Sequence, residues 1–514
     1  MKIRRLFVLV LIVCMLCPAA LAQQAEPAAS GAWVMMGYEP ESETRAWADS
    51  LFFSRMEALT GVSFTFRQYG DVEAYRAARE EAFSTGEMPD VLFKACLSPA
   101  EEMRLLQDGQ IIDLAPYLES CMPTLWTILE ARPDWREIIT QPDGAIASLP
   151  LLNGAQRQCA VWINGQWLDA LGLTMPETID EYTQVLRAFR DMDPNGNGKQ
   201  DEVPLSLVGP WEAKFLLHAW GLTPNDYNLY VDQSGTVCFA PYQEEFRAFV
   251  EWLHMALEEG LVDSQAFRQS QSMRTASLTT TDTSDNQPQT LGGMISVAPY
   301  TLVSLDDAVD YVVLTPLAYE QERVYRQLLG GVARGTFAVT SACEDVEAVL
   351  RWADYLYTEE GGRLAFAGEE GVDYTMDSQG RWRWTAEDNY GTLTNTLSLS
   401  IIAGDDVTPG LEPAAFMRNT EIDADNHVRR QTDTLRDYLV EPFPATWPTD
   451  EAREARIAEL QAALAPCIDT AIANFAMGLT ELNDETWQDF LQTLEELGAE
   501  EFIALWQEKL DETA

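Results

Sequence analysis

Apolar positions near the N-terminus follow two spacings in turn, one typical of strands and one typical of helices. Short apolar or alternating runs predict buried strands at 32–36, 62–66 and 90–94. Between these runs, 42–60 and 72–84 carry apolar residues at helical spacing. The β-α-β-α-β order that results predicts a parallel sheet covered by helices.

The ends of these strands are the first places to look for a binding site. Ligands of parallel α/β sheets lie beyond the carboxyl ends of the strands. The loops that follow the first and third predicted strands contain Tyr38, Glu39, Lys94 and Ser98. Farther along the chain, the extended pattern over 146–163 is typical of a segment that passes from one lobe to another.

Helical periodicity dominates the remainder of the chain. Thr178 and Glu181 form a capping-box pattern that predicts a helix over 179–192. The tail from Glu451 onward is almost entirely amphipathic helix, whereas the composition of 275–289 predicts a polar loop. Further helices are predicted at 214–220, 243–259, 345–357, 487–497 and 499–510.

The first residues have the pattern of a secretory signal peptide at 1–22. Basic residues within 2–5 precede an apolar run at 6–16, and small residues favour cleavage after Ala22. The apolar run is too short to span a bilayer. Cys17 lacks the setting of a lipoprotein signal, because a leucine precedes it and a proline follows it. We therefore expect an exported, unlipidated protein that is periplasmic, extracellular or held at the cell surface by an uncleaved signal.

Composition narrows the class of protein and its partners. The chain has 514 residues, of which 46% are apolar, and 15 are tryptophan, which is enough for two or more folded domains. The formal net charge is −48. So acidic a surface repels phosphate backbones and anionic lipid, which argues against nucleic acid and membranes as partners. The six cysteines that follow the expected signal peptide are scattered and show no CxxC or His/Cys spacing of a zinc site, although export permits disulfides.

The acidic loop at 191–202 predicts a calcium site. Oxygen ligands at alternate positions, with glycines that let the chain curl, are what a hard cation such as Ca²⁺ requires. An EF-hand-like count uses Asp191, Asp193, Asn195, the carbonyl of Asn197 and Glu202. The favoured count is shifted and uses Asp193, Asn195, Asn197, the carbonyl of Lys199, Asp201 and Glu202. The alternative interpretation is an acidic turn that holds no ion.

Ordered short motifs give the chain a family resemblance over nearly its whole mature length. The motifs are Gly86-Glu-Met-Pro-Asp90, Gly109-Gln-Ile-Ile-Asp-Leu114, Asp143-Gly-Ala-Ile-Ala-Ser-Leu-Pro150, Trp162-Ile-Asn-Gly-Gln-Trp-Leu-Asp-Ala-Leu-Gly172, Pro176-Glu-Thr-Ile-Asp-Glu-Tyr182, Asp193-Pro-Asn-Gly-Asn-Gly-Lys-Gln-Asp-Glu-Val-Pro204, Glu259-Gly-Leu-Val-Asp263 and Gly368-Glu-Glu-Gly-Val-Asp-Tyr374. With these motifs in this order, the chain resembles the extracellular solute-binding proteins of bacterial ABC sugar importers, in the branch that includes alginate-binding proteins. Gram-positive members usually carry a lipobox cysteine, which this chain lacks.

The resemblance implies an α/β fold of two lobes, the periplasmic-binding-protein fold, with a hinge of crossing strands and a helical C-terminal tail. The implied N-terminal lobe takes in 31–152 and 337–410, and the C-terminal lobe takes in 153–336 and 411–514. In this branch the loop that begins at Asp193 is similar to a structural calcium site, which supports the shifted count. The implied function is reversible binding of an oligosaccharide between the lobes by a monomer, and its delivery to the transmembrane subunits of an ABC permease.

A sugar site needs flat aromatic faces for the apolar side of the ring and polar groups for its hydroxyls. Trp211 and Tyr300 each follow a proline turn, and we expect them to stack on sugar rings, with packing in the core as the alternative. Tyr38, Lys94 and Arg157 are the expected polar contacts. Arg157 lies in the crossing segment, where its alternative role is a surface ion pair.

Little in the sequence favours an enzyme. The chain has 3 histidines, none at catalytic spacing, and it lacks the Gly-x-Ser-x-Gly, His-Glu-x-x-His and phosphate-cradling motifs. Carboxylate pairs are inevitable among 82 acidic residues, so a calcium-stabilised secreted glycosidase remains the second hypothesis. A sensor lobe that presents its ligand to a membrane receptor is the third, and only its partner would distinguish it from an importer protein.

Overall fold

A computed structural model describes the protein over most of its length. The described residues are 32–39, 45–141, 143–153, 158–269, 273–274, 289–327, 331–385, 399–403, 407–421, 423–440 and 451–513. The expected signal peptide at 1–22, Arg157 and most of the expected polar loop at 275–289 lie outside these residues.

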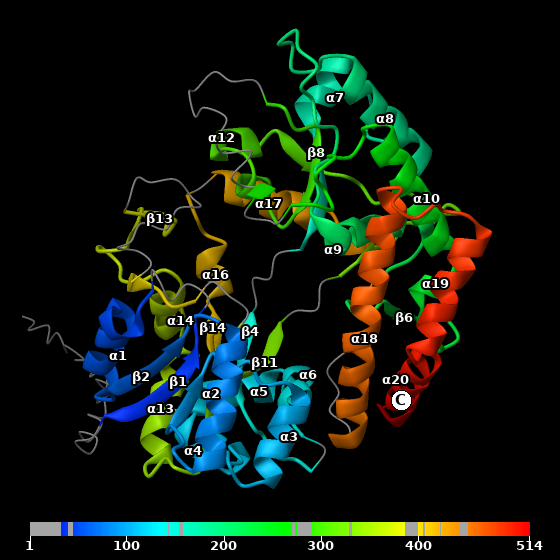
Figure 1. Ribbon diagram of the computed structural model, residues 1–514. Helices are drawn as coiled ribbons and strands as arrows, with labels where there is room; N and C mark the ends of the chain where they lie inside the picture. Colours follow the sequence, from blue (N-terminus) through cyan, green and yellow to red (C-terminus); the bar gives the residue numbers. More distant parts are fainter. Residues whose placement is uncertain are drawn as a thin grey trace, which may run out of the picture.

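Lobe 1, in the lower half of Figure 1, is built on a mixed sheet. The sheet is six-stranded, in the order β14 (Gly410–Glu412), β4 (Leu149–Asn153), β11 (Val332–Val339), β3 (Val91–Phe93), β1 (Trp33–Tyr38) and β2 (Phe64–Tyr69). β1 pairs in parallel with both β2 and β3, which confirms the parallel arrangement predicted from the sequence. β11 joins from far along the chain and runs antiparallel to β3 and β4.

Alternating side chains of this sheet bury both of its faces, as expected for strands covered by helices on two sides. Met35 and Phe93 belong to one apolar cluster, together with Trp47 and Trp352. Their neighbours Met36 and Leu92 belong to a second cluster on the other face. The helices of lobe 1 are η1 (Trp47–Asp49), α1 (Leu51–Thr60), α2 (Val72–Thr85), α3 (Pro99–Gln107), α4 (Ala115–Cys121), α5 (Pro123–Ala131), α6 (Pro133–Ile139), α13 (Val346–Tyr355) and α14 (Glu359–Phe366).

Lobe 2, in the upper half of Figure 1, has a small antiparallel sheet and more helices. Its central sheet has three strands in the order β8 (Gly293–Ser296), β5 (Ala160–Asn164) and β9 (Tyr311–Val313). Two short pairs accompany it, β6 (Leu229–Val231) with β7 (Val237–Phe239), and β10 (Tyr325–Arg326) with β15 (Leu439–Val440). The helices are α7 (Gly165–Leu171), α8 (Ile179–Asp191), α9 (Gly209–Ala213), η2 (Lys214–Trp220), η3 (Ala240–Tyr242), α10 (Glu244–Glu258), η4 (Pro299–Thr301), α12 (Leu305–Ala308), α17 (Asp423–Asp433) and η5 (Arg436–Tyr438).

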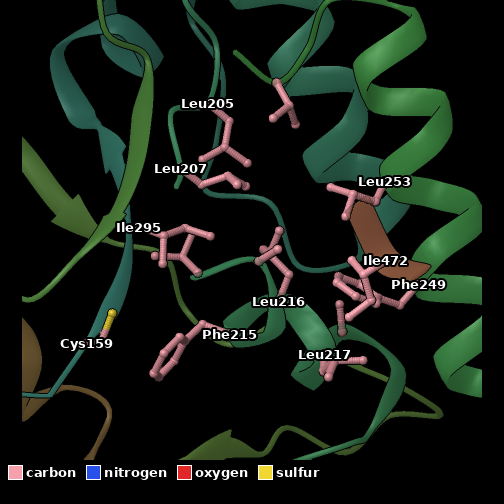
Figure 2. Close-up of a cluster of buried hydrophobic side chains, with 14 of the residues drawn as sticks. Cys159, Leu205, Leu207, Phe215, Leu216, Leu217, Phe249, Leu253, Ile295 and Ile472 are labelled. Atoms are coloured by element: carbon pink, nitrogen blue, oxygen red, sulfur yellow. The ribbon is translucent and has the colours of Figure 1, made fainter. Parts of the chain in front are cut away.

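One continuous core holds lobe 2 together. Figure 2 shows part of it, where Phe215, Leu216 and Leu217 of η2 meet Phe249 and Leu253 of α10. Ile472 of the C-terminal region belongs to the same cluster. The tail is therefore a structural part of lobe 2.

The C-terminal tail is helical, as the sequence predicted. It consists of α18 (Glu451–Ala476), α19 (Asp484–Glu496) and α20 (Ala499–Thr513). α18 packs on α9 and α10 of lobe 2 and also contacts α3 of lobe 1. Figure 1 shows α18 running beside both lobes. This helix therefore connects the lobes outside the crossing segments.

A small separate cluster of aromatic side chains lies in the described part of 367–417. The hairpin of β12 (Tyr374–Met376) and β13 (Trp382–Trp384) packs against α16 (Ala414–Met417). Trp382 is fully buried and stacks on Phe416 with ring centroids 5.1 Å apart. No pattern in the sequence predicted this unit.

The strands show where each lobe begins and ends. Lobe 1 resumes with β11 at Val332, before the predicted boundary at 337, and its sheet continues through β14 to Glu412, beyond the predicted end at 410. The chain crosses between β4 and β5, and again between β10 and β11. The cysteines of the described residues, from Cys96 to Cys467, are not joined to one another by disulfides. No helix among the described residues combines the length and hydropathy needed to traverse a bilayer.

Candidate functional site

On lobe 1, the loops at the carboxyl ends of β1 and β3 lie side by side, as the sequence predicted. Lys94 Nζ donates to Glu39 Oε2 at 2.8 Å, and neither side chain is exposed. Arg45 Nη1 lies 3.5 Å from Glu39 Oε1, and Trp47 Nε1 donates to Glu39 Oε2 at 3.2 Å. Lys94 is therefore a member of a buried ion cluster behind the protein surface, and not an exposed polar group in this structure.

The backbone around this cluster takes conformations that few residues adopt. Lys94 and Cys96 have φ of 49° and 48°, in the left-handed region. A Cβ on Gly37 would lie 1.7 Å from the carbonyl oxygen of Phe93, so only glycine permits this approach of β1 to β3. Tyr38 lies next to it, half-buried against the second apolar cluster of lobe 1. Such strain is typical of loops whose position has a function.

On lobe 2, Trp211 lies on α9 with 42% of its surface exposed. Its Nε1 donates to Asp226 Oδ1 at 2.9 Å. Its ring meets Phe215 at 74°, with centroids 5.0 Å apart. Arg326 Nη2 donates to the same oxygen of Asp226, and Arg326 Cζ lies 5.1 Å from the ring centroid of Phe215. The indole is thus fixed along its edge while much of it remains accessible.

More ion pairs surround this group. Arg274 forms two hydrogen bonds of 2.8 Å with both carboxylate oxygens of Glu212. Lys214 Nζ donates to Asp469 of α18 at 3.2 Å and to Asn228 at 3.1 Å. Burial lowers the pKa of Lys214, and the carboxylate of Asp469 opposes this shift.

Tyr300, the other expected stacking residue, lies in a different setting. It belongs to η4 and is 8% exposed. Its hydroxyl donates to Asp425 Oδ1 at 2.9 Å, and Arg429 donates to the other oxygen of Asp425 at 3.0 Å. The ring therefore packs in the core of lobe 2, which is the alternative role considered for it.

The acidic loop curls through hydrogen bonds to its own backbone. Asp193 accepts from the backbone N–H of Asn197 and Gly198 at 3.0 Å each. Asn195 accepts from the same N–H of Asn197 at 3.0 Å, and Asn197 Oδ1 accepts from that of Lys199 at 2.7 Å. Side-chain oxygens at alternate positions therefore point to the inside of the turn, and Gly196 and Gly198 supply its positive φ values of 68° and 72°.

Two side chains at the ends of the loop bear on the choice between the two counts. Asp191 ends α8 and faces Arg190, which donates to its two oxygens at 2.7 and 2.8 Å. Glu202 Oε1 is buried, with no hydrogen-bond partner among the described residues. Burial and the nearby carboxylates of Asp201 and Asp193 raise the pKa of Glu202. A buried, unsatisfied carboxylate oxygen beside other carboxylates fits a cation under either count, whereas the pairing of Asp191 with Arg190 favours the shifted count.

This fit does not amount to an assembled metal site. Nowhere in the described part of the chain do three His, Cys, Asp or Glu side chains gather closely enough to hold a metal ion. Asp201 instead accepts from Asn197 Nδ2 at 2.9 Å. Carbonyl and amide oxygens would have to complete the ligand shell.

Two polar residues of lobe 2 that lie beside Trp211, Asp226 and Arg326, were not predicted from the sequence. Asp226 lies 15 positions from Trp211 and 100 positions from Arg326 along the chain. Arg157, which was expected to act in the crossing segment, lies outside the described residues. Nothing in local periodicity could have joined Asp226 to Arg326, because their contact depends on the packing of β10 against η2.

The chain is similar to substrate-binding proteins of ABC transporters in both sequence and fold. No family model matches the chain. The chain is 25% identical over 496 residues to the fructooligosaccharide ABC transporter substrate-binding protein FusA of Streptococcus pneumoniae serotype 4, covering 90% of this chain and 87% of that protein. The solved structure of FusA with kestose superposes with a TM-score of 0.78 at 22% identity, covering 94% of this chain and 99% of the other. A further FusA structure is of an EF-hand mutant in complex with fructo-nystose.

Two other solved structures share the fold. A human-milk-oligosaccharide-binding solute-binding protein of Bifidobacterium longum infantis has a TM-score of 0.79 at 20% identity, covering 94% of this chain and 99% of the other. The alginate-binding protein AlgQ2 without calcium has a TM-score of 0.69 at 16% identity, covering 93% of this chain and 97% of the other. The two-lobe fold expected from the sequence is therefore confirmed.

Proposed function

We propose that this relative of the extracellular solute-binding proteins of bacterial ABC sugar importers is itself an exported binding protein. It binds an oligosaccharide reversibly between its two lobes and delivers the sugar to the transmembrane subunits of an ABC permease. The observation that carries the proposal is the likeness to FusA, a fructooligosaccharide-binding protein, over 90% of this chain. The exposed, edge-fixed indole of Trp211 supports a sugar ligand, because pyranose and furanose rings stack on such faces.

The proposed mechanism is closure of one lobe on the other. Lobe 1 presents the loops after β1 and β3, held by the buried cluster of Lys94 and Glu39. Lobe 2 presents Trp211 and Asp226. A ligand that contacts both lobes favours the closed arrangement, since only there are all of its contacts made. Tyr38 and Arg157 remain proposed polar contacts.

We propose that the acidic loop holds one Ca²⁺ with a structural role. The residues that would hold it are Asp193, Asn195, Asn197, Lys199 through its carbonyl, Asp201 and Glu202. The unsatisfied Glu202 oxygen supports this assignment. Calcium would neutralise neighbouring carboxylates that otherwise repel one another, and it would stiffen the connection between α8 and the central sheet.

A ligand screen tests the proposed function. The mature protein is screened by thermal shift against fructo-, malto-, galacto- and algino-oligosaccharides, and each hit is confirmed by calorimetry. A ligand present at 100 times its dissociation constant adds about 2.7 kcal/mol to the free energy of unfolding. Absence of binding to every sugar at millimolar concentration contradicts the proposal.

The same sample distinguishes binding from catalysis. A binding protein returns the bound oligosaccharide intact, whereas the glycosidase alternative shortens it, and chromatography of the sugar after long incubation decides between them. Intact mass of the exported protein tests cleavage after Ala22. A product that begins at Cys17 with attached lipid would contradict the expectation of an unlipidated protein.

A further inference from the structure

The charges around Trp211 are balanced on the described face of lobe 2. Arg326 is paired with Asp226 and Lys214 with Asp469, while Arg274 and Glu212 share two hydrogen bonds. Each buried cation therefore already faces a carboxylate. Among the described residues around Trp211, an anionic ligand would find no uncompensated positive charge, and it would lie beside the Asp226 carboxylate in a chain of net charge −48.

Asp226 keeps hydrogen-bonding capacity for a ligand. Trp211 and Arg326 both donate to its Oδ1. Its Oδ2 accepts no hydrogen bond from a described residue, and the side chain is 50% exposed. A carboxylate oxygen next to an aromatic face is suited to accept from hydroxyls of a sugar ring that stacks on the indole.

Arg326 also keeps unused donors, although it is only 5% exposed. Its Nε and Nη1 are buried with no hydrogen-bond partner among the described residues. Leaving such donors unsatisfied is costly, so they call for a water or a sugar oxygen. Its main role is to hold Asp226 in place, since Nη2 donates to the same oxygen that the indole uses.

This group lies where the chain leaves lobe 2 for lobe 1. Arg326 belongs to β10, and β11 of lobe 1 follows within a few residues. The carbonyl of Arg326 accepts from Gln158 Nε2 at 2.8 Å, and Gln158 belongs to the segment that joins β4 to β5. Two of the crossing segments therefore meet beside Asp226, which places the group at the side of lobe 2 that adjoins lobe 1.

We propose that Asp226 is the specificity-determining residue of a subsite for neutral sugars. Its carboxylate accepts from ring hydroxyls, Trp211 stacks on the same ring, and Arg326 acts as a positioning residue behind both. The subsite selects uncharged saccharides and rejects uronic acids. This inference rests on the proposed function and adds the chemical class of its ligand.

The test compares two ligand classes of equal length on the full mature chain. Calorimetry measures binding of the neutral trisaccharides 1-kestose and maltotriose and of the acidic trisaccharide trigalacturonate. We expect the unmodified protein to bind a neutral trisaccharide at least about tenfold more tightly than trigalacturonate. Asp226→Asn should weaken neutral binding about tenfold and reduce the discrimination, because one acceptor oxygen is replaced by an NH2 donor and the repelling charge is lost.

Two further variants separate the role of Asp226 from general effects. Asp226→Glu keeps the charge and moves the acceptor, so neutral binding should weaken while rejection of trigalacturonate persists. Asp484→Asn is the matched control, since Asp484 is exposed and paired with Arg247 at 2.7 Å far from the crossing segments. It should bind as the unmodified protein does, and melting temperatures show whether each variant is folded.

The outcomes are distinct. Preference of the unmodified protein for trigalacturonate overturns the inference and leaves oligosaccharide binding standing. Unchanged binding of the neutral trisaccharides in both Asp226 variants also overturns the inference and leaves oligosaccharide binding standing. If no sugar of either class binds to the unmodified protein, the proposed function fails, and the inference fails with it.

Discussion

The faces of the two lobes near the crossing segments differ in how far their charged side chains are exposed. On lobe 1, Lys94 and Glu39 are fully buried and paired, so this face presents loops that a hidden ion cluster supports. On lobe 2, the ion pair of Asp226 and Arg326 leaves Asp226 half-exposed beside an accessible indole. The sequence predicted polar contacts on both faces. The comparison teaches that a charged residue in a predicted binding loop can support that loop through a buried ion pair.

The largest expected effect comes from removing the buried carboxylate of lobe 1, which tests whether its ion pair stabilises the fold. Glu39→Gln leaves Lys94 and Arg45 facing a neutral amide in a buried place. We expect the free energy of unfolding to fall by about 3–5 kcal/mol, as for other disrupted buried ion pairs. Urea unfolding measures the effect. Glu73→Gln is the control, because its pair with Arg76 is exposed and should contribute less than about 1 kcal/mol.

A melting curve of Glu39→Gln equal to that of the unmodified protein would show that the Lys94 cluster is not a structural support. Lys94 would then regain its predicted role as a ligand contact.

Besides its ion pairs, lobe 2 buries a neutral base, His218, and this burial predicts a pH effect. Burial lowers the pKa of His218 from 6.5 to about 4. Its Nδ1 donates to the carbonyl of Phe215 at 2.7 Å, and its Nε2 has no partner among the described residues. His218 therefore becomes protonated near pH 6.5 in the unfolded chain, but only near pH 4 in the folded protein.

The stability associated with neutral His218 is complete above pH 6.5 and is lost as the pH falls toward 4. The loss attributable to this residue should approach about 3 kcal/mol. His218→Asn cannot titrate in this range, so the difference in unfolding free energy between it and the unmodified protein should change with pH. Parallel stability curves across pH 4 to 7 would contradict the expectation.

The two lobes should also differ in their dependence on calcium, because the acidic loop belongs to lobe 2 alone. Chelation should lower the melting temperature, by an amount equivalent to about 2.7 kcal/mol if free calcium was 100 times its dissociation constant. The double variant Asp193→Ala and Asp201→Ala should lose this response. Asp191→Ala should keep it, since Arg190 already holds Asp191 outside the favoured ligand set. A response lost in Asp191→Ala would support the EF-hand-like count instead.

The smallest expected effects compare the two aromatic residues of lobe 2 that were predicted to stack on sugar. Trp211→Ala should weaken binding of the oligosaccharide found by the screen by about 1–2 kcal/mol and change stability little, because the indole is 42% exposed. Tyr300→Phe should leave affinity unchanged and lower stability by about 1 kcal/mol, because it removes the hydrogen bond to Asp425. Calorimetry and urea unfolding give the two readouts. A loss of affinity in Tyr300→Phe would show that the Tyr300 hydroxyl contacts the sugar, since phenylalanine keeps the ring.

The order of elements in lobe 1 was accessible from the sequence because local patterns carry it. The predicted strand at 62–66 and helix at 72–84 correspond to β2 and α2, with ends displaced by a few residues. The late strands of the same sheet were harder to anticipate. β11 and β14 lie far along the chain, and their pairing with β4 depends on contacts that no window of sequence contains.

The candidate site divides in the same way. The acidic loop could be predicted because its oxygens alternate within one turn, and the hydrogen bonds of that turn are local. Trp211 and Tyr300 follow similar proline turns in the sequence. Trp211 is nevertheless 42% exposed, whereas Tyr300 is only 8% exposed. Burial depends on which elements pack against a side chain, and sequence spacing does not specify this.

The sequence by itself determined the charge of the protein, its expected export, the helical tail and the family it resembles, because these properties reside in composition and short-range order. Only the tertiary structure decided that Lys94 is buried against Glu39 and that Asp226 joins Trp211 to Arg326. The physical reason is that an ion pair or a binding surface depends on distances in space. Those distances are set when strands and helices far apart in the chain pack together.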